Sequence, residues 1–544
     1  FLKAEVQALP ETLVRSVPTG LKVAAIALVV TRLVISLSYL NATPYNADEV
    51  RGLYRLSGYQ RAEVFEEVFS GQTLTAADLQ RYQVPGPEKG LGAALASLAQ
   101  YPEHPPLYYV LARFAVQLGQ APILARLLSV LLGLAYLPCA YWFCVEVFRS
   151  PAAGWLSVAL LGLSPYHVLL SQGAREYSLW TLPLIVSSTL LHRALRLGER
   201  RTWIAYAVTA AVGFYSHLFF ALQFLAHGLY VLIVAGPFWP VQARSERGPS
   251  QFWPAIAAAM GSLALFGPWI WVVLTSLDTI DDNTQWVRGR NATLNTMIRG
   301  TLDNISNLFC NFGNTVRWER LLDLLILAVV AIACYCLIRW NPPRLWALLL
   351  LPVVVSFGVV ITSDILQGGG RSLQSRYLVP AMLPITFGVA FFLANTLQRS
   401  KHTWERWFGA GVLTLILLVS GVSSAVVTLS PGVDYLEQGR TASVLNVELA
   451  PFINEADNPL VLSAATHSFL LALSYEVRPE VSFQLVQNLP PEAWDEAIDL
   501  EAALRTYSDV FIYFPDEAFR DFIETTTGQE LQDVFGGRLY RIAA

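Results

Sequence analysis

Long apolar runs separated by short polar segments recur from residue 21 to residue 429. Many approach the roughly 20 residues that an α-helix needs to cross the hydrocarbon of a bilayer. We predict eleven transmembrane helices, at 21–40, 121–148, 152–171, 177–197, 201–217, 218–236, 252–276, 321–339, 345–363, 377–397 and 407–429. The pattern therefore predicts a polytopic α-helical membrane protein.

A further apolar run, at residues 105–118, is shorter and decides which way every later loop faces. As a helix it would reach about 21 Å, whereas the hydrocarbon is about 30 Å thick. If it does not cross and the N-terminus is inside, the basic segments 192–201 (HRALRLGERR) and 398–406 (QRSKHTWER) lie in the cytoplasm, as the positive-inside rule requires. We therefore predict an interfacial helix on the outer leaflet at 105–118.

The segments 41–120 and 277–320 and the tail 431–544 are then predicted to lie outside. The tail carries 19 acidic and 6 basic residues, and a helix-like stretch at 491–506 lies among four strand-like runs. The strand-like runs are 458–464, 481–487, 509–514 and 538–543. These alternating elements predict a small extracytoplasmic α/β domain after a membrane module of residues 1–430.

Composition agrees with this class, since 54% of residues are hydrophobic, 14% are charged and the mean hydropathy is +0.45. Soluble domains average about 25% charged residues. We expect a lipid bilayer and no nucleic acid as a partner. The five cysteines predict neither a disulfide framework nor a zinc site, because four lie in apolar runs and none forms a metal-like pair. The first run contains Arg32 and lacks a small-residue cleavage site, so we interpret it as a span, with Arg32 in a structural helix–helix pairing.

Polar groups at membrane depth are costly and therefore tend to be functional. In this chain, polar side chains gather at the predicted outer ends of the spans. They are Asp48 and Glu49; Glu103 and His104; Gln172, Arg175, Glu176 and Tyr177; His217; and Arg371, Arg376 and Tyr377. The set combines carboxylates, which act as bases, with arginines, which hold phosphate.

Each cluster also has an ordinary interpretation. Asp48 and Glu49 could be a solvated pair, Arg175 and Glu176 a structural ion pair, and His217 a core histidine at the membrane interface. Because all the clusters are predicted to lie on one side of the membrane, together they favour a functional site more than any one cluster does alone.

The order of these motifs resembles the GT-C glycosyltransferases, and more narrowly the family 39 group of protein O-mannosyltransferases and bacterial aminoarabinose transferases. The acidic pair is followed by HPPLYY (104–109), then P-x-H-x-x-x-S-Q-x-A-R-x-Y (165–177), S-H-x-F (216–219) and S-R-Y-x-x-P (375–380). The resemblance covers residues 21 to about 430 and leaves the tail out.

The resemblance implies an inverting transfer of a sugar from a polyprenyl-phosphate donor to a glycolipid, cell-wall glycan or protein acceptor. It implies Asp48 as the catalytic base and Glu49 as the residue that orients Asp48 or the acceptor. Glu103 and His104 match the position that contacts the donor's sugar or phosphate.

The same resemblance matches Arg175 to the arginine of the third outer turn and makes Arg371 and Arg376, with Tyr377, candidates for holding phosphate. Many relatives have Glu at the position of Gly173 and an apolar residue at that of Glu176, which leaves open the acid that partners Arg175.

We expect no cofactor and no required metal, because the sequence shows no clear metal constellation; a divalent cation on Asp48 and Glu49 is the alternative. The competing functions are a lipid-linked phosphotransferase, a polytopic transporter and a scaffold that presents the acidic tail. A transporter is disfavoured because polar residues gather at one interface and no repeat is found. We expect a multi-pass protein of the plasma membrane with its site and tail outside.

Overall fold

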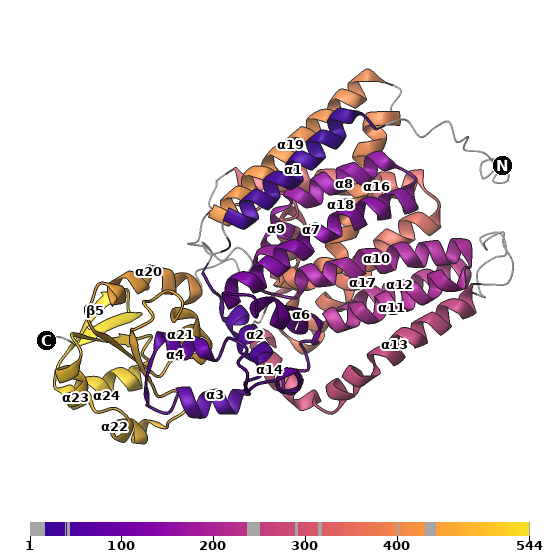
Figure 1. Ribbon diagram of the computed structural model, residues 1–544. Coiled ribbons are helices and arrows are strands. Elements are labelled where there is room, and N and C mark those ends of the chain that lie inside the picture. The colour runs from indigo at the N-terminus through magenta and orange to yellow at the C-terminus, as the bar shows by residue number, and fades with distance from the viewer. Residues whose placement is uncertain are drawn as a thin grey trace.

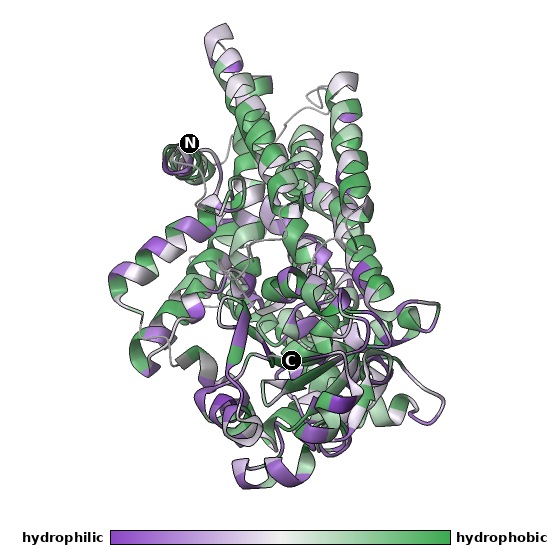
Figure 2. Cartoon of the chain, turned by 90° about the vertical axis from the view of Figure 1, so that its left-hand side faces the viewer, coloured by the Kyte–Doolittle hydropathy of each residue, from purple (hydrophilic) through white to green (hydrophobic). Residues whose placement is uncertain are grey.

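The computed structural model describes residues 17–38, 40, 44–236, 251–288, 292–313, 318–399, 402–429 and 442–542. A bundle of long helices forms one part of the molecule, and a sheet flanked by short helices forms the other (Figure 1). The hydropathy of the chain follows this division, because the long helices are mostly hydrophobic and the hydrophilic residues concentrate towards the sheet (Figure 2).

Helices occupy all eleven positions that the apolar runs predict. Ten positions hold one helix each, and 152–171 holds two: α1 (Thr19–Ser38), α7 (Ala121–Phe148), α8 (Pro151–Leu163), α9 (Pro165–Gln172), α10 (Tyr177–Leu197), α11 (Arg200–Ser216), α12 (Phe220–Ala235), α13 (Phe252–Leu274), α16 (Glu319–Trp340), α17 (Pro343–Gln367), α18 (Val379–Arg399) and α19 (Thr403–Leu429). Among the described residues, seven helices are long and apolar enough to cross a membrane, or eight if one bent pair counts as a span. The polytopic helical class is confirmed, whereas the number eleven stays a prediction.

The predicted span 152–171 is two helices, α8 and α9, which bend by 59° at Ser164. Pro165 lacks an N–H for the preceding turn and is the first residue of α9, a position that favours a new helix. The Ser164 hydroxyl caps α9 by accepting from the His167 N–H at 3.4 Å, and it donates to the Leu308 carbonyl at 2.6 Å.

Arg32 of α1 reaches across this break. Its guanidinium donates to the carbonyl of Leu161 on α8 at 3.1 Å and to the carbonyl of His167 on α9 at 3.3 Å. It also donates to the hydroxyls of Tyr136 (3.0 Å) and Ser171 (2.9 Å). The buried cation thus satisfies carbonyls on both sides of the bend, in the structural role that was predicted for it.

Short helices follow α1 and carry the first polar clusters. They are α2 (Ala47–Ser57), α3 (Arg61–Val68), α4 (Ala76–Arg81), α5 (Leu91–Ala99) and α6 (Leu107–Val116). The α6 helix, within the predicted interfacial segment, is only about 15 Å long, and it exposes Leu111 and Phe114 while it buries Tyr108 and Tyr109. Its length and apolar outer stripe fit a helix that lies along a bilayer surface.

Two more helices, α14 (Leu277–Arg288) and α15 (Leu294–Ser306), precede α16, and two 3-10 turns, η3 (Arg371–Leu373) and η4 (Ser375–Leu378), precede α18. The chain re-enters the bundle at η4 through a Gly368–Gly369 bend. Gly369 has φ 126°, and a Cβ there would lie 3.0 Å from the Val287 carbonyl oxygen. The bend therefore requires glycine.

The sheet has six strands in the order β1-β3-β2-β4-β6-β5. They are β1 (Thr73–Thr75), β2 (Pro459–Ser463), β3 (Ser482–Leu485), β4 (Asp509–Tyr513), β5 (Leu531–Phe535) and β6 (Leu539–Ile542). The central strands β3, β2 and β4 are parallel, and the remaining pairs are antiparallel. Four strands, β2, β3, β4 and β6, coincide with predicted ones. β5 was not predicted, and β1 comes from the first long segment between spans.

Short helices cover the sheet: α20 (Ala442–Asn454), α21 (His467–Leu473), η5 (Pro491–Ala493), α22 (Trp494–Ala497), α23 (Leu500–Thr506) and α24 (Glu517–Thr527). Alternate strand residues face two cores, as the period of two in a strand requires. Val461 lies in one core and Leu460 in the other. The predicted module boundary at residue 430 lies outside the described residues.

Side chains of α2 also pack in the core that contains Val461. Val50 and Tyr54 of α2 are buried with Leu470 and Leu471 of α21. Arg51 on α2 donates a hydrogen bond to the Ser468 hydroxyl at 3.1 Å. The sheet-containing part therefore packs directly on the helix that carries Asp48.

Candidate active site

The N-terminus of α2 presents the acidic pair. Asn46 caps the helix by accepting from the Glu49 N–H at 2.9 Å, and Glu49 returns a bond by accepting from the Asn46 N–H at 3.1 Å. This capping box stabilises the first helical turn and fixes Asp48 in it. Gly58, at φ 96°, ends the helix in the left-handed conformation.

Glu49 is enclosed in the protein with Arg126 of α7; the two side chains are 2% and 1% exposed. Arg126 donates from Nε to Oε1 at 2.8 Å and from Nη2 to Oε2 at 2.7 Å, a bidentate pair. The Ala174 N–H donates to Oε1 at 2.7 Å. Burial raises the pKa of Glu49, but Arg126 and the backbone donors outweigh it and lower the pKa below its usual value. Glu49 thus ties α2 to α7 and to the turn before α10.

Asp48 lies between three arginines and is 30% exposed. Its Oδ2 is 2.8 Å from Nη1 of Arg175 and 3.2 Å from Nη1 of Arg376, and its Oδ1 is 3.6 Å from Nη1 of Arg51. Burial acts to raise the pKa of Asp48, but Arg175 and then Arg376 and Arg51 lower it below its ordinary range. The first polar cluster, the third outer turn and the loop before α18 therefore meet at one carboxylate.

The acid that pairs with Arg175 in the third outer turn, which the resemblance left open, is Glu176. It accepts from Nε and Nη2 of Arg175, both at 3.0 Å, while Nη1 of the same guanidinium faces Asp48. Nδ1 of His104 lies 3.5 Å from Glu176 Oε1, and the Tyr109 hydroxyl donates to Oε2 at 3.1 Å. The charged partners of Glu176 lower its pKa well below normal, although burial alone would raise it.

Several predicted residues lie beside this cluster or apart from it. Arg371 pairs with Asp364 at 3.2 Å, so Arg376 is the arginine of its loop that reaches Asp48. The other predicted residues contact neighbours outside the Asp48 carboxylate: Glu103 accepts from Asn283, Gln172 donates to Thr428, His217 stacks on Trp180, Tyr377 packs on Phe219, and Tyr177 lies under the guanidinium of Arg175.

Sequence reasoning missed three residues of the cluster. Arg51 is three residues after Asp48, on the same helix face, which was a usable signal. Arg126 is a lone cation in a predicted span, and such residues usually have a defined partner. Tyr109 gave no signal beyond its place in HPPLYY. Within the described residues, no three His, Cys, Asp or Glu side chains form a group that could hold a metal ion, and metal independence stays a prediction.

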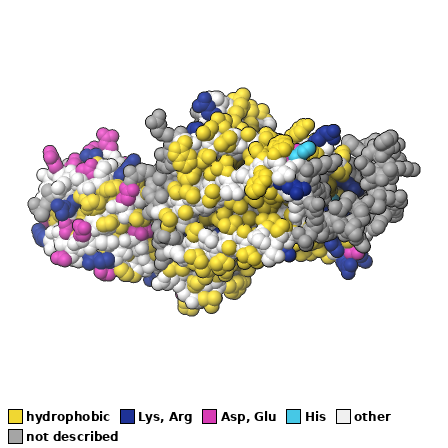
Figure 3. All heavy atoms as spheres, turned by 90° about the horizontal axis from the view of Figure 1, so that it is seen from above, with side chains coloured by type: hydrophobic (Ala, Val, Ile, Leu, Met, Phe, Trp, Pro, Cys, Tyr) yellow, Lys and Arg dark blue, Asp and Glu magenta, His cyan; other side chains and the backbone are white. Residues whose placement is uncertain are grey.

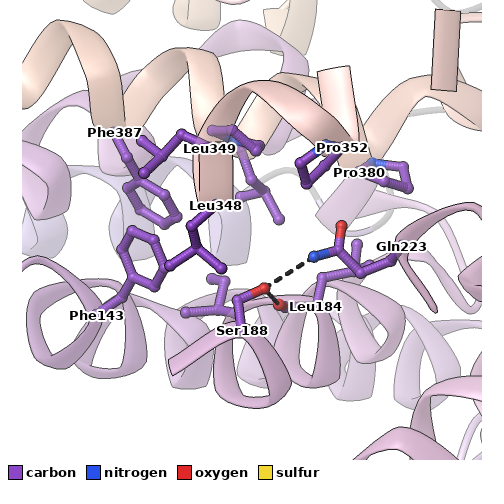
Figure 4. Close-up of a pocket in the computed structure, with 12 residues that line it drawn as sticks. Phe143, Leu184, Ser188, Gln223, Leu348, Leu349, Pro352, Pro380 and Phe387 are labelled. Atoms are coloured by element: carbon purple, nitrogen blue, oxygen red, sulfur yellow. Dashed lines mark hydrogen bonds between the residues drawn. The ribbon is translucent and has the colours of Figure 1, made fainter. Parts of the chain in front are cut away.

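A small cavity lies elsewhere, inside the bundle between α7, α10, α12, α17 and α18 (Figure 4). Its volume of about 20 Å³ has room for about one water molecule. Apolar side chains line most of it, and Gln223 donates to Ser188 at 2.8 Å on one wall. The cavity is too small for a sugar, so the polar cluster around Asp48 remains the candidate site.

No protein-family model and no curated protein matches the chain at the level of sequence. Solved structures do match. ArnT from Cupriavidus metallidurans in the apo state aligns with a TM-score of 0.55 and 13% identity, over 95% of this chain and 97% of that one. The same protein bound to undecaprenyl phosphate gives 0.52 and 13% over the same shares. An oligosaccharyltransferase from Archaeoglobus fulgidus gives 0.47 and 9%, over 92% of this chain and 71% of that one. The ArnT alignments confirm the GT-C fold that the motifs predicted.

Proposed function

We propose that this protein is a membrane glycosyltransferase that moves a sugar from a polyprenyl-phosphate donor to an acceptor hydroxyl, with inversion. One observation carries the proposal: a partly exposed carboxylate, Asp48, contacts the guanidinium groups of Arg175 and Arg376 at one end of a GT-C helix bundle. Support comes from the ArnT structure, which has this fold and is described as bound to undecaprenyl phosphate.

In this reaction Asp48 accepts the proton of the acceptor hydroxyl as its oxygen attacks the anomeric carbon. The bond from that carbon to the phosphate oxygen breaks, and the lipid phosphate leaves with the bonding electrons. Arg175 and Arg376 stabilise the negative charge that develops on the leaving phosphate. Glu49, which is enclosed by Arg126, acts as a positioning residue for α2.

The arginines also set the basicity of Asp48. A carboxylate whose pKa is lowered by Arg175 and Arg376 is a weak base. A phosphate competes with Asp48 for the same guanidinium donors, and each contact that moves to the phosphate lets the pKa of Asp48 rise. Donor binding would therefore prepare the base for the acceptor.

We place the site on the outer face of the plasma membrane. Basic residues at the opposite helix ends, including Arg149, Arg193 and Arg200, support this orientation through the positive-inside rule. Acidic side chains gather over the sheet-containing part, and a broad apolar band crosses the middle of the molecule (Figure 3). A lipid-borne donor suits this face, because nucleotide sugars are cytoplasmic. We propose a glycolipid, cell-wall glycan or protein as the acceptor.

The test compares Asp48→Asn with the control Asp303→Asn, which changes a carboxylate paired with Arg320 instead. Binding of undecaprenyl phosphate is measured on the purified proteins. Turnover is measured as its release from synthetic undecaprenyl-phosphate monosaccharides, with water or an added glycolipid supplying the acceptor hydroxyl. We expect Asp48→Asn to bind the carrier and to lose about 10²–10⁴-fold in turnover. Arg175→Met and Arg376→Met should bind the carrier about tenfold more weakly or worse. Unchanged turnover in Asp48→Asn would refute the proposal.

A further inference from the structure

The face of α2 that carries Asp48 continues towards the C-terminal end of the helix. Asp48, Arg51, Gly52 and Arg55 are spaced i, i+3, i+4 and i+7, which places them on one side. Arg55 is about 10.5 Å along the axis from Asp48. A Cβ on Gly52 would lie 3.2 Å from Cε1 of Tyr109, so that ring packs against the helix between the two charged residues. Asp48 and Arg55 therefore flank the Tyr109 ring on one face of α2.

Among the described residues, Arg55 is a buried cation without an acid partner. It is 5% exposed, and its guanidinium carbon lies 3.6 Å from the ring centre of Tyr101. Its Nε is buried and donates to no acceptor, and no carboxylate oxygen lies within 4.0 Å of it in the described part of the chain. Buried arginines are normally paired, and stacking on Tyr101 does not satisfy the N–H groups at the guanidinium edge.

Glu103 leaves a matching acceptor unused. Its Oε1 accepts from Nδ2 of Asn283 on α14 at 3.1 Å, while its Oε2 is buried and has no hydrogen-bond partner among the described residues. The charge of Glu103 acts on Arg55, yet the two are not in ion-pair contact. Glu103 lies in the turn in which the His104 N–H donates to the Tyr101 carbonyl at 2.9 Å, and Arg55 stacks on Tyr101. Within the part of the chain that the structure describes, an unpaired donor and an unpaired acceptor of opposite charge therefore belong to the surroundings of one turn.

We propose that Arg55 and Glu103 form a subsite for an uncharged sugar ring. This inference rests on the proposed function and adds a substrate class to it. Arg55 would donate to one ring hydroxyl, and a neighbouring hydroxyl would donate to Oε2 of Glu103. The two charges cancel, so the subsite has no net charge that would favour an acidic or a basic sugar, and both groups are used in hydrogen bonds to hydroxyls of a neutral ring. The sugar belongs either to the donor or to the acceptor.

The experiment uses the full-length protein in lipid nanodiscs and three probes: undecaprenyl phosphate, its synthetic glucosyl, mannosyl and galactosyl forms, and methyl pyranosides added to protein saturated with undecaprenyl phosphate. The variants are Arg55→Met and the isosteric Glu103→Gln. The control is Arg61→Met, because Arg61 also stacks on an aromatic ring, that of Phe65, but is solvent-exposed on α3.

We expect both site variants to bind bare undecaprenyl phosphate with the affinity of the wild type. This unchanged binding would also show that the phosphate site of each variant is folded. If the sugar is the donor's, they bind at least one sugar-bearing carrier about tenfold more weakly or worse. If it is the acceptor's, only the methyl pyranosides lose affinity. Equal loss for bare and sugar-bearing carriers, or no loss for any probe, overturns the subsite. Failure of the wild type to bind bare undecaprenyl phosphate would overturn the proposed function as well.

Discussion

The buried pair of Glu49 and Arg126 offers the sharpest energetic test of how the site is held together. Glu49 accepts from two Arg126 nitrogens, at 2.8 and 2.7 Å, and from the N–H groups of Ala174 and Asn46. Glu49→Gln keeps the shape but removes the charge, which leaves a guanidinium that is 1% exposed without its counter-ion. Breaking a buried pair in this way costs about 3–5 kcal/mol.

Arg126→Met should cost a similar amount, because it leaves Glu49 as the unpaired charge. The double variant removes both charges, so its loss should be smaller than the sum of the single losses by about 2–3 kcal/mol. The free energy of unfolding is measured by denaturant titration of the purified proteins, with tryptophan fluorescence as the signal. The exposed pair of Glu199 and Arg201 is the control, and its variants should change little. Additive losses at Glu49 and Arg126 would refute the buried-pair interpretation.

Three further predictions concern pH, packing and orientation. Because its pKa is lowered, ionised Asp48 stabilises the folded state above about pH 4, and this stabilisation is lost as the pH falls further. The difference in stability between the wild type and Asp48→Asn, measured from unfolding midpoints, should therefore be constant from pH 8 to 5 and change only below about pH 4. Leu471→Ala, in the buried contact between α21 and α2, should cost about 2–5 kcal/mol in denaturant unfolding and lower turnover; full turnover would contradict a role of this contact in placing Asp48. In intact cells an impermeant thiol reagent should label Thr526→Cys and not Arg200→Cys, both exposed positions; the reverse result would invert the proposed orientation.

The extent to which the site could be predicted differs from residue to residue. Asp48, Arg175, Glu176 and Arg376 were all predicted, and the structure brings them into contact. Arg371 was predicted by the same reasoning but pairs with Asp364, because the loop turns its guanidinium back towards the end of α17. A motif places a residue at a membrane face, but the path of the backbone decides where its side chain points.

The sequence alone determined where the long helices lie, which strands build most of the sheet, and that the polar clusters share one face. These features follow from the transfer free energy of local segments, which each run of residues carries with it. Tertiary structure decided the rest: the bend at Ser164, the strand β1 inserted from residues 73–75, and the contact of Arg376 with Asp48 across 328 positions. Such contacts depend on how distant segments pack around buried charge, and local hydropathy does not encode that packing.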